Sequence, residues 1–340
     1  MGRSLSSLAL FISKRLLQLI PVIIAVVTIT FFFARISVSN PCAAWEGARA
    51  SKSSIQACIH YFGLNLPLYV QYERYWAQLL SGNWGIDPNS GQPVLPTILS
   101  AFPETLELVL AALFLIVVVG IPLGVIAANS NGRLGDHLVR IFYLSGWATP
   151  TYLAATILAI GVGSTLGISS GTFTTNPPPF PQPTHFSVLD ALLAGNLAAT
   201  WDALVHLILP AVALAFLNMG IVTRLTRSAM LETLPLDFVK TARMKGLSEF
   251  RVLYKHALRH SLITTTTILG LTAGYLLGST VVVEEIFQWP GIGAYAYTAV
   301  TTYSFSGTLG VVIFFAIGVV FANLIADILY GVLDPRVEWR

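Results

Sequence analysis

A polar, basic segment between two long apolar stretches carries the side chains best suited to binding another protein. It runs from Asp237 to Leu262 and reads DFVKTARMKGLSEFRVLYKHALRHSL. Asp237 suits the first turn of a helix, Gly246 suits a left-handed residue at its end, and Ser248 can cap a second helix. The pattern predicts two short helices that meet at a glycine turn and offer one face to a soluble partner. The same residues also allow an ordinary amphipathic helix at a membrane surface.

The only two cysteines, Cys42 and Cys58, are the residues that could form a covalent cross-link. Both follow the first apolar stretch and fall in a segment that we expect outside the cell. An oxidising exterior favours a disulfide between them, whereas two free thiols are the alternative. A zinc site is a poor fit, because two sulfurs without a nearby pair of histidines supply too few ligands.

Composition indicates that lipid is the solvent around the elements that position these residues. Of 340 residues, 55% are hydrophobic and 10% are charged, whereas soluble domains carry about 25% charged residues. A membrane helix needs about 20 mostly apolar residues, and six stretches meet this need, which predicts an all-α membrane protein with six transmembrane helices. They are Leu16–Ala34, Thr105–Ala128, Leu138–Leu166, Leu204–Val222, Ile263–Val283 and Thr308–Leu333.

The basic residues predict the orientation. With both termini in the cytoplasm, only four of the 19 Lys and Arg residues fall outside, and this asymmetry is typical of membrane proteins. The net charge of +3 forms no patch on a soluble face, so we expect no nucleic-acid partner. The four outside residues are Arg35, Arg49, Lys52 and Arg74.

Three parts follow from this topology. Residues 1–35 hold the N-terminus and first helix, residues 36–103 form a long outside loop, and residues 104–340 form the membrane core, which includes the basic loop 234–262. Within the outside loop, residues 66–80 begin at a proline and carry apolar side chains at helical spacing, which predicts an amphipathic helix.

Two further patterns lie in the last two predicted membrane helices. Gly270, Gly274 and Gly278 form a stripe of small residues that lets helix backbones approach, either within the chain or at a moving contact near a pathway. Asp327 is an acid deep in the sixth stretch, and a hydrogen-bonded structural role is favoured over ion coupling. Glu284 is expected to lie near the outside, where a carboxylate needs no special explanation.

The loop carries a resemblance to a known family. Thr241-Ala-Arg-Met-Lys-Gly246, followed after nine residues by His256-Ala-Leu258, resembles the EAA signature of ABC-importer permeases. Thr241, Arg243 and Arg259 depart from its general form in a way that is similar to the dipeptide/oligopeptide subfamily. Other similar segments include Leu66–Tyr72, Pro103–Leu108, Gly120–Gly124, Phe287–Gly293 and Leu333–Arg336.

The resemblance implies a type I ABC importer fold and a permease subunit that performs no covalent chemistry. Because the chain has no Gly-x4-Gly-Lys-Ser/Thr loop, ATP and Mg would be bound by separate ATPase subunits, and this chain would hold no cofactor or metal. The implied partners are two ATPase domains, a second and related permease, an external substrate-binding protein and the bilayer. The residues implied to couple to the ATPase are Thr241, Ala242, Arg243, Lys245, Gly246, Leu247, His256 and Leu258.

The cargo implied is a dipeptide or oligopeptide, although related importers carry oligosaccharides or nickel. An ion-coupled secondary transporter is the alternative of a different class. It would require buried titratable groups in mid-membrane, for which Asp327 is the candidate.

Overall fold

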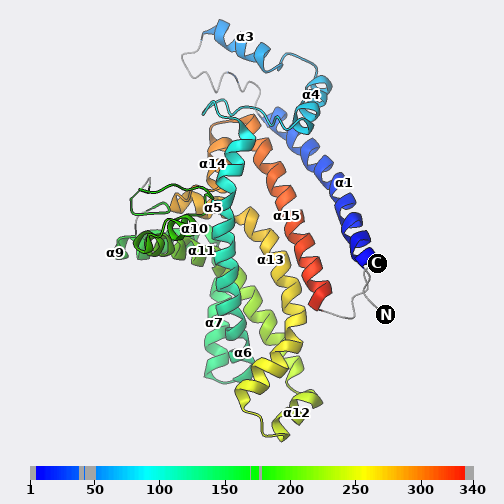
Figure 1. Cartoon of the computed structure of the whole chain (residues 1–340), viewed down its shortest axis with the longest axis vertical. Helices are drawn as coiled ribbons and strands as arrows, with labels where there is room; N and C mark the ends of the chain where they lie inside the picture. Colours follow the sequence, from blue (N-terminus) through cyan, green and yellow to red (C-terminus); the bar gives the residue numbers. More distant parts are fainter. Residues whose placement is uncertain (1–4, 38–41, 43–50, 169, 176–177, 334–340) are drawn as a thin grey trace.

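The structure, a computed structural model, describes residues 5–37, 42, 51–168, 170–175 and 178–333. Throughout these ranges the regular structure is helical apart from one isolated two-residue bridge. Most of the long helices follow one axis, with α12 (Asp237–Met244) at one end and α3 (Lys52–Tyr61) and α4 (Leu68–Leu80) at the other (Figure 1). We call these the α12 end and the α4 end.

Four helical spans in the described part are long and apolar enough to cross a membrane, and a bent pair provides up to one more. The predicted count of six is therefore not reproduced: α1 (Leu5–Ser37) is a helix, but its described apolar stretch, Ile20–Phe33, is shorter than a span. The four spans are Val94–Asn129, which joins α5 (Val94–Leu115), η1 (Ile116–Gly120) and α6 (Ile121–Asn129); α11 (Leu197–Thr233); Ile268–Phe287 of α13 (Leu258–Phe287); and Phe305–Ile325 of α15 (Phe305–Leu333).

The third predicted span, Leu138–Leu166, is broken. α7 (Leu134–Ala148) and the helical run Thr151–Leu166, which comprises α8 (Thr151–Thr156), η2 (Ile157–Gly163) and α9 (Ser164–Leu166), meet at a bend of 105°. Pro150 has no N–H for a continuing helix and favours an extended residue before it. Thr149 is extended accordingly, with φ −94° and ψ 116°.

The long loop after α1 has its own helical structure. α4 matches the predicted amphipathic helix and begins directly after Pro67, while α3 was not predicted. Cys42 and Cys58 are joined in a disulfide, with their Cα atoms 5.9 Å apart. This bond ties α3 to the segment that follows α1.

α11 is the helix around which the bundle is built, because α5, α6, α7 and α13 all pack against it. One crossing depends on two glycines: a Cβ at Gly220 would lie 2.8 Å from the Tyr143 carbonyl oxygen, and a Cβ at Gly146 would lie 2.8 Å from that of Phe216. No side chain fits at either position. Glycine on both helices therefore allows α7 and α11 to touch through their backbones.

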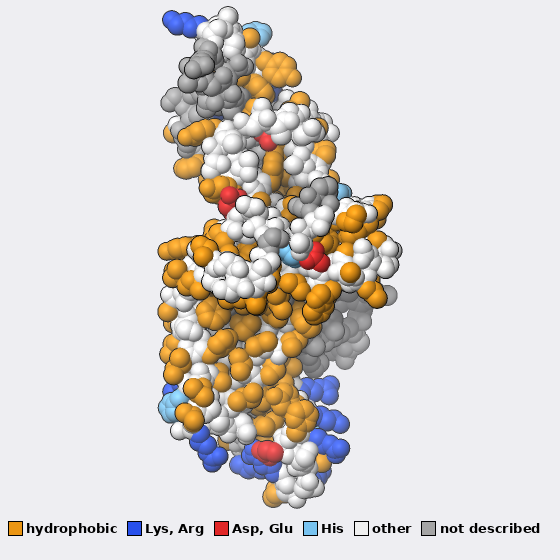
Figure 2. Space-filling model, turned by 90° about the vertical axis from the view of Figure 1, so that its left-hand side faces the viewer, with side chains coloured by type: hydrophobic (Ala, Val, Ile, Leu, Met, Phe, Trp, Pro, Cys, Tyr) orange, Lys and Arg blue, Asp and Glu red, His pale blue; other side chains and the backbone are white. Residues whose placement is uncertain are grey.

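Side-chain chemistry divides the surface into zones (Figure 2). Apolar side chains gather in a belt over the middle of the molecule, and Lys and Arg gather at the end that carries α12. An apolar belt with basic residues at one end is typical of a protein that spans a bilayer.

The glycine stripe on α13 does not behave as one contact. Gly274 is buried against α15, where an added Cβ would lie 3.3 Å from Asn323 Oδ1 and 3.5 Å from Val319 Cγ1. Gly278, one turn further on, is exposed and has nothing within 4 Å of such a Cβ. Packing within the chain therefore accounts for Gly274 and not for Gly278.

This difference predicts unequal effects of leucine. Gly274→Leu should destabilise the protein by about 1–3 kcal/mol, because the extra atoms overpack the α13–α15 contact. Gly278→Leu, the matched control, should leave the thermal unfolding midpoint of the detergent-solubilised protein close to that of the wild type. Similar midpoints for the two variants would contradict this packing of α13 on α15.

Candidate functional site

The basic loop at the α12 end folds as helix, glycine turn and helix. α11 ends at Thr233, Asp237 begins α12, and Gly246 follows with φ +72°, a left-handed conformation that favours glycine. The chain resumes a helix at Glu249 and passes through the wide turn η3 (Arg251–Ala257) into α13. The predicted glycine turn is confirmed.

The loop is anchored by its own apolar face. Val239 and Ala242 on α12 are buried together with Val252, Leu253 and Ala257 in the main hydrophobic cluster. Arg243 Nη2 donates to Glu249 Oε1 at 2.6 Å, which bridges the two sides of the glycine turn. The two short helices therefore form one unit with the bundle.

The opposite face of the loop is exposed and partly apolar. Met244 is 79% exposed and Phe250 is 69% exposed, although both are large hydrophobic residues. Basic side chains are exposed beside them, from Arg243, Lys245 and Arg251. An exposed apolar group with a charged rim has the composition of a protein-binding surface. The predicted coupling residues include neither Met244 nor Phe250, although both are large apolar residues within the polar loop.

The predicted coupling residues fall into two groups. Thr241, Arg243, Lys245 and Gly246 are exposed, and Leu247 and His256 are half-buried. Ala242 and Leu258 are buried inside the chain. Ala242, although predicted to couple to an ATPase, therefore offers no side chain to a partner, because α12 turns this residue into the main hydrophobic cluster.

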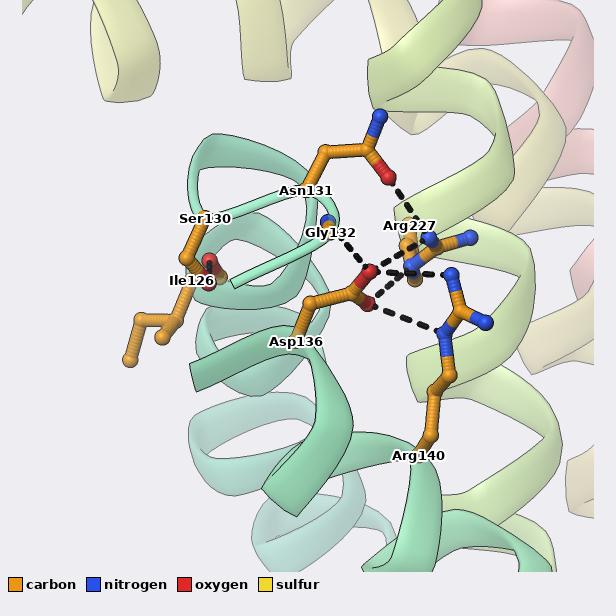
Figure 3. Close-up of polar contacts among 7 residues, drawn as sticks. All are labelled: Ile126, Ser130, Asn131, Gly132, Asp136, Arg140 and Arg227. Carbon is orange, nitrogen blue, oxygen red and sulfur yellow. Dashed lines mark hydrogen bonds and ion pairs between the residues drawn. The ribbon is translucent and has the colours of Figure 1, made fainter. Parts of the chain in front are cut away.

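A second polar cluster joins α7 to α11 near the end of α11 that leads into the loop (Figure 3). Asp136, in the first turn of α7, is fully buried. Its carboxylate accepts from Arg227 Nε at 2.6 Å, from Arg140 Nη2 at 2.9 Å and from the Gly132 amide at 3.0 Å. Arg227 also donates to Asn131 Oδ1 at 3.0 Å. The cluster ties α7 and the turn before it to α11, two turns before α11 ends.

Comparison with known proteins identifies the family. Residues 120–339 match the family model described as the binding-protein-dependent transport system inner membrane component. The chain belongs to this family. It is thus a permease, and its membrane-spanning helices agree with an inner membrane component.

Similarity to known permeases extends over nearly the whole chain. The probable D,D-dipeptide transport system permease protein DdpB of Escherichia coli is 38% identical over 95% of this chain and 96% of its own length. The di/tripeptide permease DppB of Pseudomonas aeruginosa is 38% identical over 96% and 98%, and the oligopeptide permease AppB of Bacillus subtilis is 33% identical over 98% and 100%. An inward-facing structure of the MetNI methionine ABC transporter shares the fold, with a TM-score of 0.50 and 16% identity over 71% of this chain and 97% of that one.

The permease also buries carboxylates that the sequence analysis overlooked. Glu284 was expected near the outside, where a carboxylate is ordinary, but its side chain is fully buried. Its carboxylate accepts from Thr105 Oγ1 at 2.9 Å and from the Ala294 amide at 3.1 Å, while Thr105 Oγ1 accepts from the Ile292 amide at 2.8 Å. Glu284 therefore joins α5, α13 and α14 (Ile292–Thr301).

Among the described positions, no group of three or more His, Cys, Asp or Glu residues is arranged to hold a metal ion. Asp327 lies on α15, but its side chain is outside the described residues. The chemistry that the described site supports is noncovalent binding at the loop.

Asp136 should be important for the stability of the junction between α7 and α11. Asp136→Asn keeps the size but removes the charge that faces two guanidinium groups, so we expect a loss of about 2–3 kcal/mol. Most of this loss comes from the pair with Arg227, whose side chain is 13% exposed, because solvent screens the pair with Arg140, which is 41% exposed. Asp237→Asn, at an exposed ion pair with Lys240, is the control and should cost less than about 0.5 kcal/mol. Equal unfolding midpoints for the two variants would argue against this role.

Proposed function

We propose that this permease is the transmembrane subunit of an ATP-driven importer and forms half of the pathway for dipeptides or oligopeptides. The observation that carries this proposal is the similarity over at least 95% of the chain to permeases named for dipeptide and oligopeptide transport. A second, related permease completes the pathway, and an external substrate-binding protein delivers the cargo. Oligosaccharides or nickel are the alternative cargoes, and ligand binding by the cognate external protein distinguishes them.

The loop at the α12 end is the proposed contact with the ATPase subunits, which bind ATP and Mg. Exposed Met244 and Phe250 supply the apolar part of the contact, and Arg243 and Lys245 supply charge. Buried Ala242 and Leu258 hold the loop on the bundle. Since the loop is packed into the same cluster as α11 and α13, displacement of its outer face moves the membrane helices.

One face of α13 is a further part of the proposed pathway. Leu271, Tyr275, Gly278 and Val282 lie on this face at spacings of four, three and four residues, and all are exposed. We infer that they contact the second permease or the cargo path. In this arrangement, of the three glycines in the stripe, Gly278 serves the pathway and Gly274 serves packing.

The proposed orientation places the α12 end in the cytoplasm and the α4 end outside the cell membrane, with six spans and both termini inside. It is supported by the basic side chains at the α12 end (Figure 2). The disulfide Cys42–Cys58 then lies in the oxidising compartment.

An ion-coupled transporter remains the alternative class. Buried carboxylates are the observation that favours it. One of them is Glu284, which accepts hydrogen bonds from the Thr105 hydroxyl and from the Ala294 backbone amide. Purification of the permease with its ATPase subunits, together with substrate uptake that stops when ATP is removed, favours the importer. Uptake driven by an ion gradient without ATP would favour the alternative.

The contact with the ATPase can be tested at Met244. Met244→Glu should preserve folding, because nothing in the chain covers this side chain, but should reduce ATPase co-purification and uptake at least tenfold by placing a charge in the contact. Leu80→Glu is the matched control, since Leu80 is 80% exposed and lies at the other end. Gly246→Glu should act like Met244→Glu, with an added cost of about 1 kcal/mol for the left-handed residue.

Ala242→Glu separates docking from folding. It should destabilise the loop itself, because a carboxylate would be buried in the hydrophobic cluster. Normal co-purification and uptake in Met244→Glu and Gly246→Glu would rule out the loop as the ATPase contact.

The orientation predicts which single cysteines react with an impermeant thiol reagent in sealed, right-side-out cells. Ser90→Cys, near the α4 end, should be labelled, and Ser248→Cys, at the α12 end, should be labelled only after the membrane is opened. Both serines are exposed, so access to the compartment decides the result. Labelling of Ser248→Cys in intact cells would contradict the proposed topology.

A further inference from the structure

A cavity at the α4 end has no role in the proposed coupling or in the pathway. It has a volume of about 280 Å³, many times the roughly 10–15 Å³ that one water molecule needs by this measure. Its lining comes from the end of α1, from α4, from the turn at residues 61–64, from residues 83–86 and from the start of α15. Segments distant in the sequence therefore enclose one space large enough for a group of several heavy atoms.

Two arginines line this cavity, and its described lining contains no carboxylate. Arg35 is half-buried, and its guanidinium lies 3.9 Å from the centroid of the Phe305 ring and 5.6 Å from that of Phe31. Its buried Nε has no hydrogen-bond partner. Arg74 is exposed at the same cavity, and no ion pair among the described residues involves either arginine. Burial lowers the pKa of Arg35 to about 10, so its charge persists at neutral pH.

Amide and aromatic side chains complete the lining. Asn83 accepts from the Gly85 amide through Oδ1 at 3.1 Å, which leaves its NH2 group as a donor. Gln71 Nε2 donates to the Leu64 and Leu66 carbonyls at 3.2 and 2.7 Å, and these bonds fix the turn that forms one wall. Tyr75 and Trp84 line the cavity beside Phe305. Planar donors and aromatic walls suit an anionic group that is attached to an apolar body.

The cavity lies at the boundary between the apolar belt and the polar α4 end. Arg35 lies two residues after the apolar stretch Ile20–Phe33 of α1. Phe33 and Ile36, on either side of Arg35 in the sequence, are 71% and 76% exposed, and Tyr69 on α4 is also exposed. Large apolar side chains beside arginine and tyrosine at a helix end are typical of the depth at which lipid headgroups lie.

We propose that this cavity binds the phosphate group of an anionic phospholipid in the outer leaflet, with Arg35 at its inner part and Arg74 at its opening. Two positive charges with no acid in the described lining favour a headgroup with net negative charge, and the exposed apolar face of α1 receives the acyl chains. The lipid then joins α1 to α4 and to the start of α15 on the outer side of the bundle.

The test uses the full-length permease with its partner subunits, reconstituted in phosphatidylcholine nanodiscs that contain a minor fraction of phosphatidylglycerol. Wild-type protein, Arg35→Gln, Arg74→Gln and the control Lys52→Gln are extracted, and retained phosphatidylglycerol is measured by native mass spectrometry. Both arginine variants should retain about tenfold less than the wild type, whereas Lys52→Gln should not differ. Arg74 is exposed, so its substitution keeps the test valid even where Arg35→Gln folds poorly.

A second arm distinguishes a lipid from a free ion. Inorganic phosphate or phosphatidylglycerol is added to delipidated wild-type protein, and the thermal midpoint is followed. A rise with the lipid alone, lost in Arg74→Gln, supports the lipid headgroup. An equal rise with inorganic phosphate, also lost in Arg74→Gln, keeps the phosphate site but assigns it to the free ion. Equal lipid retention in all four proteins overturns the proposal. Normal lipid retention in the two arginine variants, together with lost affinity for the external binding protein, also overturns it.

Discussion

The structure depends on α11, a helix longer than a bilayer is thick. Its 37 residues extend about 55 Å, whereas the hydrocarbon core of a bilayer is about 30 Å thick. Within lipid, every backbone group must be bonded inside the protein, so a continuous helix is the simplest element that can carry a mechanical link from the membrane to the polar loop. The other helices pack around it, and its end leads directly into α12.

Two contacts of different chemistry fix this helix to its neighbours. Near the middle, Gly146 and Gly220 bring the backbones of α7 and α11 together. Toward the α12 end, Asp136 bonds Arg227 and Arg140 and so fixes the same two helices through charge. Dispersion forces act at the close backbone contact, and ion pairing acts toward the end where basic side chains gather. This division lets one helix pair remain joined in both environments.

The sequence was most informative where a local pattern decides the structure. Hydropathy located the long helices, the proline before α4 located its start, and Gly246 located the left-handed turn. It was least informative where distant residues meet. Thr105 and Glu284 are 179 positions apart and hydrogen-bond each other, so no local pattern could reveal that Glu284 is buried. Ala242 was misplaced because small residues suit both a docking face and a tight internal contact, and only the packing on Val252 and its neighbours separates these.

Pro210 divides α11 into two arms of unequal length. Proline removes one backbone hydrogen bond and so concentrates bending at its position. The 23 residues from 211 to 233 contain no other proline and form an arm of about 35 Å that ends at α12. A tilt of about 10° around Pro210 moves the end of this arm by about 6 Å, roughly one helical turn. A pivot that lies nearer the start of α11 than its end thus converts a small rotation into a displacement as large as a whole step of helix packing.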